Sequence, residues 1–288
     1  MEKIDFKKVS KNKVKVSINN ETHHRKIIKR DNGDYFRFSG EKHYLEPQIP
    51  ESVNRKNTPS FNINKRFKML GDFTDMVLNG VVNSLLVTGQ GGLGKSHSVM
   101  EQIQKMDLVE DEDYVVIKGY STPKALYRTI YENSDKIIVF DDCDSVLKDP
   151  TALNLLKGAL DTYDKRVISW KSSGFVPDDL PSSVEFKGQV IFISNLSPNK
   201  IDGAVKSRTI SVDVSMNTKE KIQRIESVMG EILPEYTMNS KKEVLEFLKN
   251  NLEHCEALNF RTFQNITKVR NEKQEDWKSM ALYLLLNT

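Results

Sequence analysis

The stretch Leu85-Leu86-Val87-Thr88, followed by Gly89-Gln90-Gly91-Gly92-Leu93-Gly94-Lys95-Ser96, decides the fold of this chain. A short apolar run that favours a buried strand precedes a complete G-x-x-x-x-G-K-S phosphate-binding loop. Glycines let the backbone turn its N–H groups toward phosphate oxygens, and the positive end of the following helix dipole adds to them. Lys95 supplies a cation to the β- and γ-phosphates, while the Ser96 hydroxyl ligates Mg²⁺.

The loop therefore predicts a site for a nucleoside triphosphate with its magnesium ion. A glycine-rich turn between a strand and a helix also occurs without a ligand, but here every fixed position of the motif is filled. The residues expected to hold the nucleotide are Gly89, Gln90, Gly91, Gly92, Leu93, Gly94, Lys95, Ser96 and His97.

A second apolar run, Lys136-Ile137-Ile138-Val139-Phe140-Asp141-Asp142, ends in two carboxylates. We expect a fully buried strand whose Asp141 holds Mg²⁺ through its water shell, while Asp142 positions and polarises the attacking water. Two acids after a strand also serve as caps of the next helix. The loop upstream favours the metal-binding and catalytic interpretation.

Length and composition indicate a soluble globular protein, because 288 residues with 38% hydrophobic content contain no long apolar run. The first residues, Met1-Glu2-Lys3-Ile4-Asp5, lack the apolar segment of a secretory signal. The two cysteines, Cys143 and Cys255, have no metal-ligand spacing. We expect a cytoplasmic protein with neither a membrane span nor a disulfide framework.

The net charge of +3 is unevenly distributed along the chain. Residues 1–70 contain 17 Lys and Arg against 8 Asp and Glu, and the remainder contains 26 against 32. Within the basic part, residues 13–46 predict a small β meander, with strands at 13–18, 25–28 and 35–38 and a turn at 31–34. Residues 47–60 predict a polar linker. Basic residues interleaved with aromatic ones suit contact with nucleic acid. Lysine-rich surfaces also arise for solubility alone, so both interpretations stay open.

The order of the motifs resembles the AAA+ ATPases over about residues 62–272. The strand Gln189-Val190-Ile191-Phe192-Ile193-Ser194 with Asn195 at its tip looks like the family's sensor 1 strand. Lys206-Ser207-Arg208 is similar to the Ser-Arg element that carries the arginine finger in clamp-loader-like members. Leu258-Asn259-Phe260-Arg261-Thr262-Phe263 resembles the start of the sensor 2 helix, with Arg261 as the sensor.

The resemblance implies an α/β, three-layer P-loop NTPase core with a parallel sheet. We expect this core over residues 61–216, a basic β-rich region with its linker over residues 1–60, and an α-helical lid over residues 217–288. The lid helices are expected at about 218–233, 241–252, 261–269 and 275–286, because apolar residues recur there at helical spacing.

The same resemblance implies roles for single residues. Asn195 would share a hydrogen bond with the attacking water and the γ-phosphate, and Arg261 would close onto the phosphates from the lid. Arg208 would reach the nucleotide of a neighbouring subunit, which requires a homo-oligomeric ring such as a hexamer. A surface arginine remains the alternative for Arg208, and Arg270 competes with Arg261 for the sensor role.

One residue departs from the family pattern. AAA+ ATPases usually have Glu after the metal-binding Asp, whereas this chain has Asp142, which is shorter by one methylene. Because water positioning tolerates little displacement, we expect slow turnover or assistance from Asp144.

The chain uses about 45 residues between Asp142 and the sensor 1 strand, more than one helix needs. Residues 166–170 and 183–187 predict two strands around a loop, an arrangement that resembles the hairpin of superfamily 3 viral helicases. In that family a basic tip contacts DNA, so Lys171 and Phe175 are candidates for nucleic-acid contact. A surface hairpin without a partner is the alternative. Residues 119–135, by contrast, leave room for one short helix and little for the aromatic loop of protein unfoldases.

These implications combine into Mg²⁺-dependent hydrolysis of ATP to ADP and phosphate by a ring of subunits. The Lys-, Asn- and Ile-rich composition resembles ATPases encoded by phages and plasmids, which act in the cytoplasm of a bacterial host. The leading hypothesis is a motor, helicase or loader acting on DNA. The second is a nucleotide-dependent switch or scaffold that binds a partner protein and hydrolyses slowly, in keeping with Asp142.

Overall fold

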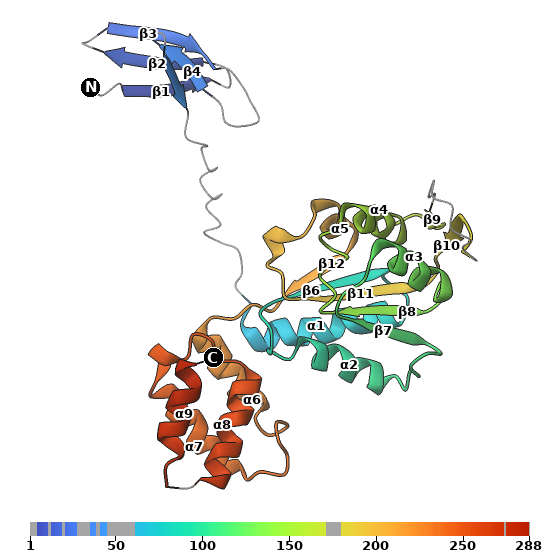
Figure 1. Cartoon of the computed structure of the whole chain (residues 1–288), viewed down its shortest axis with the longest axis vertical. Helices are drawn as coiled ribbons and strands as arrows, with labels where there is room; N and C mark the ends of the chain where they lie inside the picture. The colour runs from blue at the N-terminus through green and yellow to red at the C-terminus, as the bar shows by residue number, and fades with distance from the viewer. Residues whose placement is uncertain are drawn as a thin grey trace. The chain divides into compact units, whose positions relative to one another are not determined.

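The structure is a computed structural model, and it describes residues 5–10, 13–18, 21–27, 35–38, 41–44, 61–170, 180–273 and 275–287. The chain divides into two compact units, Met1–Ser60 and Phe61–Thr288. The smaller unit contains β-strands, and the larger one contains an α/β core followed by helices (Figure 1).

The first unit is built from short antiparallel strands. They are β1 (Asp5–Ser10), β2 (Lys13–Ile18) and β3 (Glu21–Lys26), which form one sheet, and β4 (Tyr35–Phe38) and β5 (Glu41–Tyr44), which form a hairpin. Val16, Ile27 and Phe36 are buried and supply its core.

The predicted strands at 13–18 and 35–38 are confirmed, and the β-rich character of the unit with them. A further strand expected at 25–28 instead spans 21–26, and β1 and β5 were not expected. The expectation failed at β3 because its first four residues, Glu21 to His24, are all polar and give no apolar alternation. The turn expected at 31–34 and the linker at 47–60 lie outside the described residues.

The core of the second unit is a five-stranded, fully parallel sheet in the order β12-β6-β11-β8-β7. Its strands are β6 (Ser84–Thr88), β7 (Tyr114–Lys118), β8 (Ile137–Asp141), β11 (Gln189–Ser194) and β12 (Ile210–Asp213). The three central strands are buried along almost their whole length, as expected for parallel strands covered on both faces.

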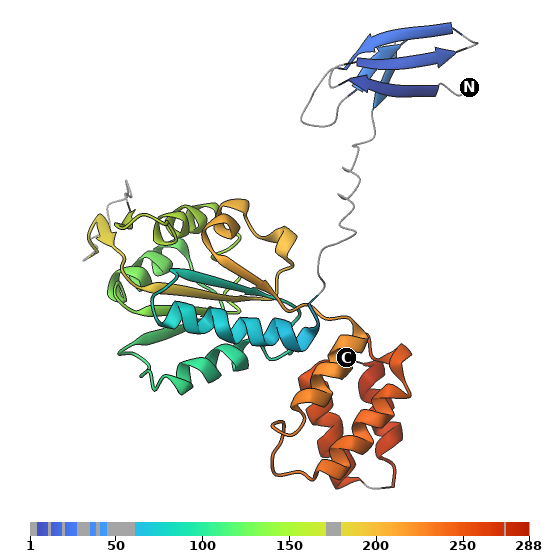
Figure 2. The same cartoon turned by 180° about the vertical axis from the view of Figure 1, so that it is seen from behind.

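Helices cover both faces of this sheet (Figures 1 and 2). They are α1 (Ile63–Leu78) and α2 (Lys95–Lys105) on one face, and α3 (Pro123–Glu132), α4 (Pro150–Ala159) and α5 (Gly203–Arg208) on the other. Each face of the sheet has its own hydrophobic cluster, and successive residues of β6 belong to different clusters. Leu85 packs in the cluster that contains Leu70 of α1, and Leu86 in the cluster that contains Leu126 of α3. The three-layer α/β fold with a parallel sheet is confirmed.

Local signals place several of these elements. Asn62 caps α1 by accepting a hydrogen bond from the Lys65 N–H, and Thr122 caps α3, which has Pro123 at its first position. Between β7 and β8 the chain forms α3 alone, as expected from its length. The two predicted hairpin strands are also confirmed as β9 (Val167–Ser169) and β10 (Ser183–Glu185), which pair antiparallel. Strand β12 was not expected.

The C-terminal region is helical and has its own hydrophobic cluster, which includes Ile225, Leu248 and Phe263. Its elements are α6 (Thr218–Val228), α7 (Met238–Lys249), α8 (Phe260–Glu272) and α9 (Trp277–Leu286), and the chain also has the 3₁₀ turns η1 (Pro198–Lys200) and η2 (Leu252–His254). Among the described residues, no helix combines the length and the apolar character needed to cross a membrane.

Helix α6 ends earlier than expected. The sequence predicts a helix as far as residue 233, but it stops at Val228 and the chain turns at Gly230. Glycine is a poor helix former, and Pro234 disfavours a helical residue before it. The three residues Glu231 to Leu233 are thereby released into a loop beside the phosphate-binding loop.

Candidate nucleotide-binding site

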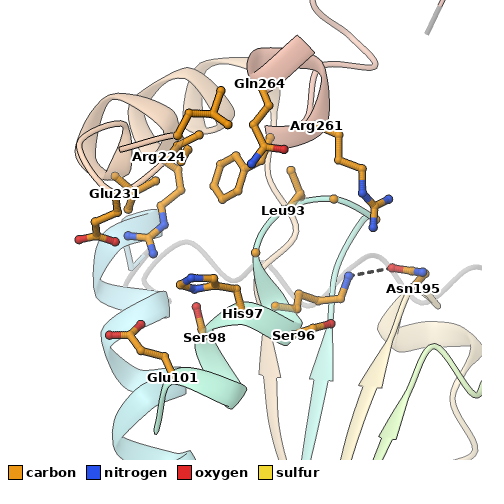
Figure 3. A pocket seen from close by; sticks show the side chains of 18 of the residues that line it. Leu93, Ser96, His97, Ser98, Glu101, Asn195, Arg224, Glu231, Arg261 and Gln264 are labelled. Carbon is orange, nitrogen blue, oxygen red and sulfur yellow. Dashed lines mark hydrogen bonds between the residues drawn. The ribbon is translucent and has the colours of Figure 1, made fainter. Parts of the chain in front are cut away.

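The predicted phosphate-binding loop runs from the end of β6 to the start of α2, and it lines a cavity of about 380 Å³. The opposite wall comes from the helical region, so the cavity lies between the α/β core and the lid (Figure 3). From the loop side, the lining consists of Gly91, Gly92, Leu93, Gly94, Lys95, Ser96, His97, Ser98 and Glu101 of α2, with Asp142 and Asn195 beside them.

Lys95 is the most buried polar residue of the loop, with 5% of its surface exposed. Its Nζ donates hydrogen bonds to the carbonyl oxygens of Gly89 and Gln90, each at 2.9 Å, and to Asn195 Oδ1 at 2.7 Å. Burial lowers the pKa of this ammonium group, whereas nearby carboxylates, Asp142 foremost, oppose the shift. The cation is therefore held at the loop by neutral oxygens that phosphate oxygens can replace.

The two residues expected to hold magnesium lie in direct contact. Ser96 Oγ donates a hydrogen bond of 2.6 Å to Asp141 Oδ1, which joins the start of α2 to the end of β8. Lys118 Nζ lies 3.9 Å from the other oxygen of Asp141, and its side chain is 73% exposed. Hydroxyl and carboxylate oxygens are ligands that Mg²⁺ prefers, so this pair fits the ion that a nucleotide would bring.

Asp142 follows Asp141 in a left-handed backbone conformation, with φ of 55°. Its Oδ1 accepts a hydrogen bond of 2.7 Å from Asn195 Nδ2. Partial desolvation raises the pKa of the Asp142 carboxyl, although the residue is exposed, and the neighbouring Asp141 raises it further. Because the Asn195 amide contacts Lys95 through its oxygen and Asp142 through its nitrogen, it bridges the loop to the acidic strand.

Asp144, the residue expected to assist Asp142, has a different partner. Its Oδ1 accepts a hydrogen bond of 2.6 Å from Ser194 Oγ at the end of β11. This contact fixes the turn after β8 against the strand that carries Asn195.

The lid contributes its wall mainly through helix α8. Phe260 N–H donates a 2.9 Å hydrogen bond to the carbonyl of Gly92, and Asn259 caps the helix. Arg261 and Gln264 line the cavity from the same helix (Figure 3). Arg270, the rival of Arg261, lies elsewhere in the lid, with its Nε 2.7 Å from Glu243.

Two glycines of the loop have left-handed φ values and face the lid closely. Gly92 and Gly94 have φ of 72° and 87°, which residues with a Cβ rarely adopt. A Cβ at Gly94 would lie 2.8 Å from the ring of Phe260, and one at Gly92 would lie 3.1 Å from the Asn259 side chain. Glycine therefore serves both the turn and the approach of the lid.

Arg208 does not line this cavity. It is the last residue of α5, and it lies near the N-terminal end of β6, whereas the loop follows the C-terminal end of that strand. There its carbonyl accepts a hydrogen bond from Ser84, the first residue of β6. The five residues of β6 separate it from the phosphate-binding loop by about 15 Å. Its guanidinium contacts the carbonyl of Ala204 through Nη1, and its buried Nε has no partner among the described residues.

Several lining residues were not expected from the sequence. They are Ser98, Glu101, Arg224, Val228, Glu231, Ile232, Leu233, Phe260 and Gln264. Arg224 and Val228 on α6 are spaced four residues apart, as are Phe260 and Gln264 on α8, and this spacing is a local signal that indicates a shared face. The Arg224 guanidinium lies 4.1 Å from the Phe67 ring centroid, and its Nη1 is 3.4 Å from Asn64 Oδ1, so it connects α6 to α1. The tip candidates Lys171 and Phe175 lie outside the described residues.

Comparisons with known proteins add a relative but no family. No protein-family model matches the chain. An uncharacterised 36.7 kDa protein from the nrdC–mobD intergenic region of Enterobacteria phage T4 is 27% identical over 253 residues, covering 81% of this chain and 77% of the phage protein.

Among solved structures, a variant of RuvB from Thermotoga maritima has a TM-score of 0.46 at 12% identity, covering 77% of this chain and 68% of its own. PCH-2 from C. elegans has a TM-score of 0.40 at 14% identity, covering 80% and 68%. The α/β fold is established by the strand order and the helices that cover the sheet, independently of these likenesses.

Proposed function

We propose that this chain is an ATPase of the AAA+ type that hydrolyses Mg²⁺-bound ATP at the cavity between its core and its lid. The observation that carries the proposal is the set of contacts between the phosphate-binding loop and the ends of β8 and β11. Lys95, Asn195 and Asp142 form one connected chain of hydrogen bonds, and the Ser96–Asp141 pair lies beside it. A cation, two carboxylates and a water-orienting amide are the groups that phosphoryl transfer to water requires.

The phosphate half of the cavity is the glycine loop with the start of α2. Its backbone N–H groups and the N-terminal end of the helix dipole attract phosphate oxygens. Lys95 Nζ exchanges the loop carbonyls for the β- and γ-phosphates, and Ser96 and Asp141 hold the magnesium ion. The ion neutralises phosphate charge when it is bound. No group of three or more acidic, His or Cys side chains in the described residues forms a separate metal site, in keeping with an ion bound partly by the nucleotide.

The nucleoside half of the cavity is formed by the lid. Its apolar lining comes from Val228, Ile232, Leu233 and Phe260, and polar groups come from Gln264 and Glu231. An apolar wall with a few polar groups suits a base and a ribose, and a volume of about 380 Å³ is in the range of small-molecule sites. Bound nucleotide therefore joins the core to the lid.

The hydrolytic step is assigned to Asp142 and Asn195. Asp142 accepts a hydrogen bond from the attacking water and orients it, while Asn195 holds both that carboxylate and the γ-phosphate end of the nucleotide. Asp142 is one methylene shorter than the usual Glu, so we expect turnover to be slow.

The active form is proposed to be a ring of identical subunits, with a hexamer as the expected size. Arg208 supports this proposal, because it is remote from the cavity of its own chain and its Nε has no partner among the described residues. A neighbouring subunit would receive its charge at the γ-phosphate, and Arg261 would supply a second cation from the lid.

The work driven by hydrolysis is proposed to be the handling of DNA, in a bacterial cell that a phage infects. The basic composition of residues 1–60 and the β9–β10 hairpin support this role. The second candidate is a nucleotide-dependent switch that recruits a partner protein. The short acid Asp142 favours it, because a slow ATPase remains long in its ATP-bound state.

Nucleotide binding and phosphate release, measured with the Lys95→Ala variant, test the proposal. Lys95→Ala is expected to weaken ATP binding at least 100-fold and to abolish hydrolysis, whereas Lys268→Ala, an exposed lysine of α8, is expected to behave as the unmodified chain. Retained ATP affinity in Lys95→Ala would overturn the site. A DNA-independent hydrolysis rate, together with an unchanged rate in Lys171→Ala, would favour the switch over the motor.

A further inference from the structure

One face of the three-stranded sheet of the first unit is basic. Residues 5–26, which include the strands β1 to β3, contain seven Lys and Arg against two Asp and Glu. Side chains alternate between the two faces of a strand. Val16 is fully buried on one face, whereas Lys15, His24 and Lys26 are exposed. The buried core of this unit therefore leaves the other face of the sheet to solvent.

The strand register places basic residues opposite one another. Lys15 of β2 pairs with Lys7 of β1 on one side and with His24 of β3 on the other. Lys13 pairs with Lys26 in the adjacent row. We call this set of five positions, Lys7, Lys13, Lys15, His24 and Lys26, the basic face.

Such pairing is unfavourable for the isolated sheet. Like charges directly opposite each other on neighbouring strands destabilise a sheet. Within the described residues, no ion pair is formed by Lys15 or Lys26 that would offset the repulsion. The repulsion is relieved when an anionic partner covers the face.

The geometry of the basic face matches a polymer with closely spaced negative charges. Positions two residues apart on a strand are separated by about 6.6 Å, and neighbouring strands by about 4.8 Å. The row of Lys7, Lys15 and His24 thus spans two strand spacings, roughly 10 Å. The negative charges of a nucleic-acid backbone follow one another at intervals shorter than this row of about 10 Å. Several lysines can therefore contact one nucleic-acid strand at once.

The remaining positions of the same face decide between classes of anionic partner. The next row consists of Asp5, Ser17 and Thr22, which are all polar, whereas Val9 lies at the irregularity between Lys8 and Ser10 and has no partner in the register. An element that inserts into a lipid surface carries apolar or aromatic residues that enter the boundary of the bilayer. Polar residues that surround lysines are instead typical of sequence-independent contact with phosphates.

We propose that the basic face of the β1–β3 sheet binds the phosphate backbone of nucleic acid without sequence preference. This inference specifies the DNA-handling role proposed above, but it does not require ATP hydrolysis. Lys15 on the central strand and Lys26 at the end of β3 carry the binding. The α/β core acts on the nucleic acid that the first unit holds.

The test is fluorescence anisotropy of the full chain with labelled single- and double-stranded oligonucleotides in the absence of ATP, with salt varied between about 50 and 200 mM. The variant Lys15→Glu/Lys26→Glu is expected to bind at least tenfold more weakly. For Lys15→Gln/Lys26→Gln, we expect the slope of log Kd against log salt to fall by about 1.5, since each phosphate contact contributes about 0.7 to 0.9. Lys15→Arg/Lys26→Arg is expected to retain binding.

The matched control is Lys268→Glu/Lys273→Glu, which changes the net charge equally at two exposed lysines of the lid. Its affinity is expected to stay within twofold of the unmodified chain, and circular dichroism checks that all variants are folded. Equal loss in both charge reversals would overturn the proposal, as would binding confined to anionic vesicles or to polyglutamate. Because ATP is absent, DNA binding without ATPase activity would support this inference while contradicting the proposed function.

Discussion

The Gln90 side-chain amide pairs with the backbone of Met216 through two hydrogen bonds. Met216 N–H donates to Gln90 Oε1 at 3.0 Å, and Gln90 Nε2 donates to the Met216 carbonyl at 3.3 Å. Gln90 lies in the phosphate-binding loop, and Met216 lies between β12 of the core and α6 of the lid. The same connection is held by Arg66 of α1, whose Nη1 is 2.6 Å from the Ser215 carbonyl. These contacts therefore join the loop to the segment that leads to the lid.

We predict that Gln90→Ala loosens this connection. The loss of two hydrogen bonds is expected to cost about 1–3 kcal/mol and to accelerate amide hydrogen exchange at residues 214–217, with nucleotide affinity reduced several-fold. Gln90→Glu retains the acceptor for Met216 N–H and should give an intermediate exchange rate. Unchanged exchange in Gln90→Ala would mean that the pair does not hold the connection.

Gly94→Ala is expected to destabilise the chain even without nucleotide. A left-handed residue with a Cβ costs about 1–2 kcal/mol, and the added methyl would lie 2.8 Å from the Phe260 ring. Urea unfolding of the nucleotide-free chain measures this loss. The loss has two causes, the left-handed backbone conformation and the contact with the Phe260 ring, and Phe260→Leu removes only the contact. Adding Phe260→Leu to Gly94→Ala is therefore expected to recover part of the lost stability and not all of it. Recovery of none would show that the backbone conformation alone determines the cost.

The sequence predicts the core of the fold well where strands are buried on both faces. Continuous apolar runs mark β6, β8 and β11. Strand β12, by contrast, has only four residues and alternates with polar ones, so the pairing with β6 identifies it and its own sequence does not.

The site, like the fold, is predictable where local sequence determines it and not where tertiary packing does. The loop and the acidic pair are fixed by residues close in sequence, and the structure places Asp142 in the cavity wall and Asp141 in contact with Ser96 of the loop. Gln90 and Met216 are 126 residues apart, and the lid wall depends on how α6 and α8 pack against the core. No local spacing encodes contacts of this kind, because they arise only from the tertiary arrangement.

The two cysteines are expected to be unreactive in the folded chain. Cys143 and Cys255 have 2% and 0% of their surfaces exposed, and burial raises the pKa of both thiols, that of Cys255 to about 11. A thiol-reactive chromophore should therefore label both sites slowly until a denaturant is added. Rapid labelling of Cys255→Ser under native conditions would show that Cys143 is accessible.

The Cys255 thiol also predicts a pH dependence of stability. Its pKa rises from 9.0 in the unfolded chain to about 11 in the folded one, so the unfolded state releases the proton first. The stability that the protonated Cys255 thiol contributes is fully present below pH 9. This contribution, about 2–3 kcal/mol, is lost as the pH rises toward 11. Cys255→Ala should lose less stability over this range, when urea midpoints are compared at pH 8 and pH 10.5. Equal losses in both proteins would assign the pH dependence to other groups.

Arg208→Ala is predicted to leave ATP binding intact while hydrolysis collapses, since Arg208 lies outside the cavity of its own chain. Asp142→Asn is predicted to bind ATP and to be equally inactive, because its side chain can no longer accept the proton or orient the water. A mixed ring contains interfaces in which an intact Asp142 meets an intact Arg208, so a mixture of the two variants should recover measurable phosphate release. The expected rate is highest near equal proportions and absent from each variant alone. A mixture that remains inactive, although size-exclusion chromatography shows the two variants in one assembly, would argue that each site is complete within a single chain.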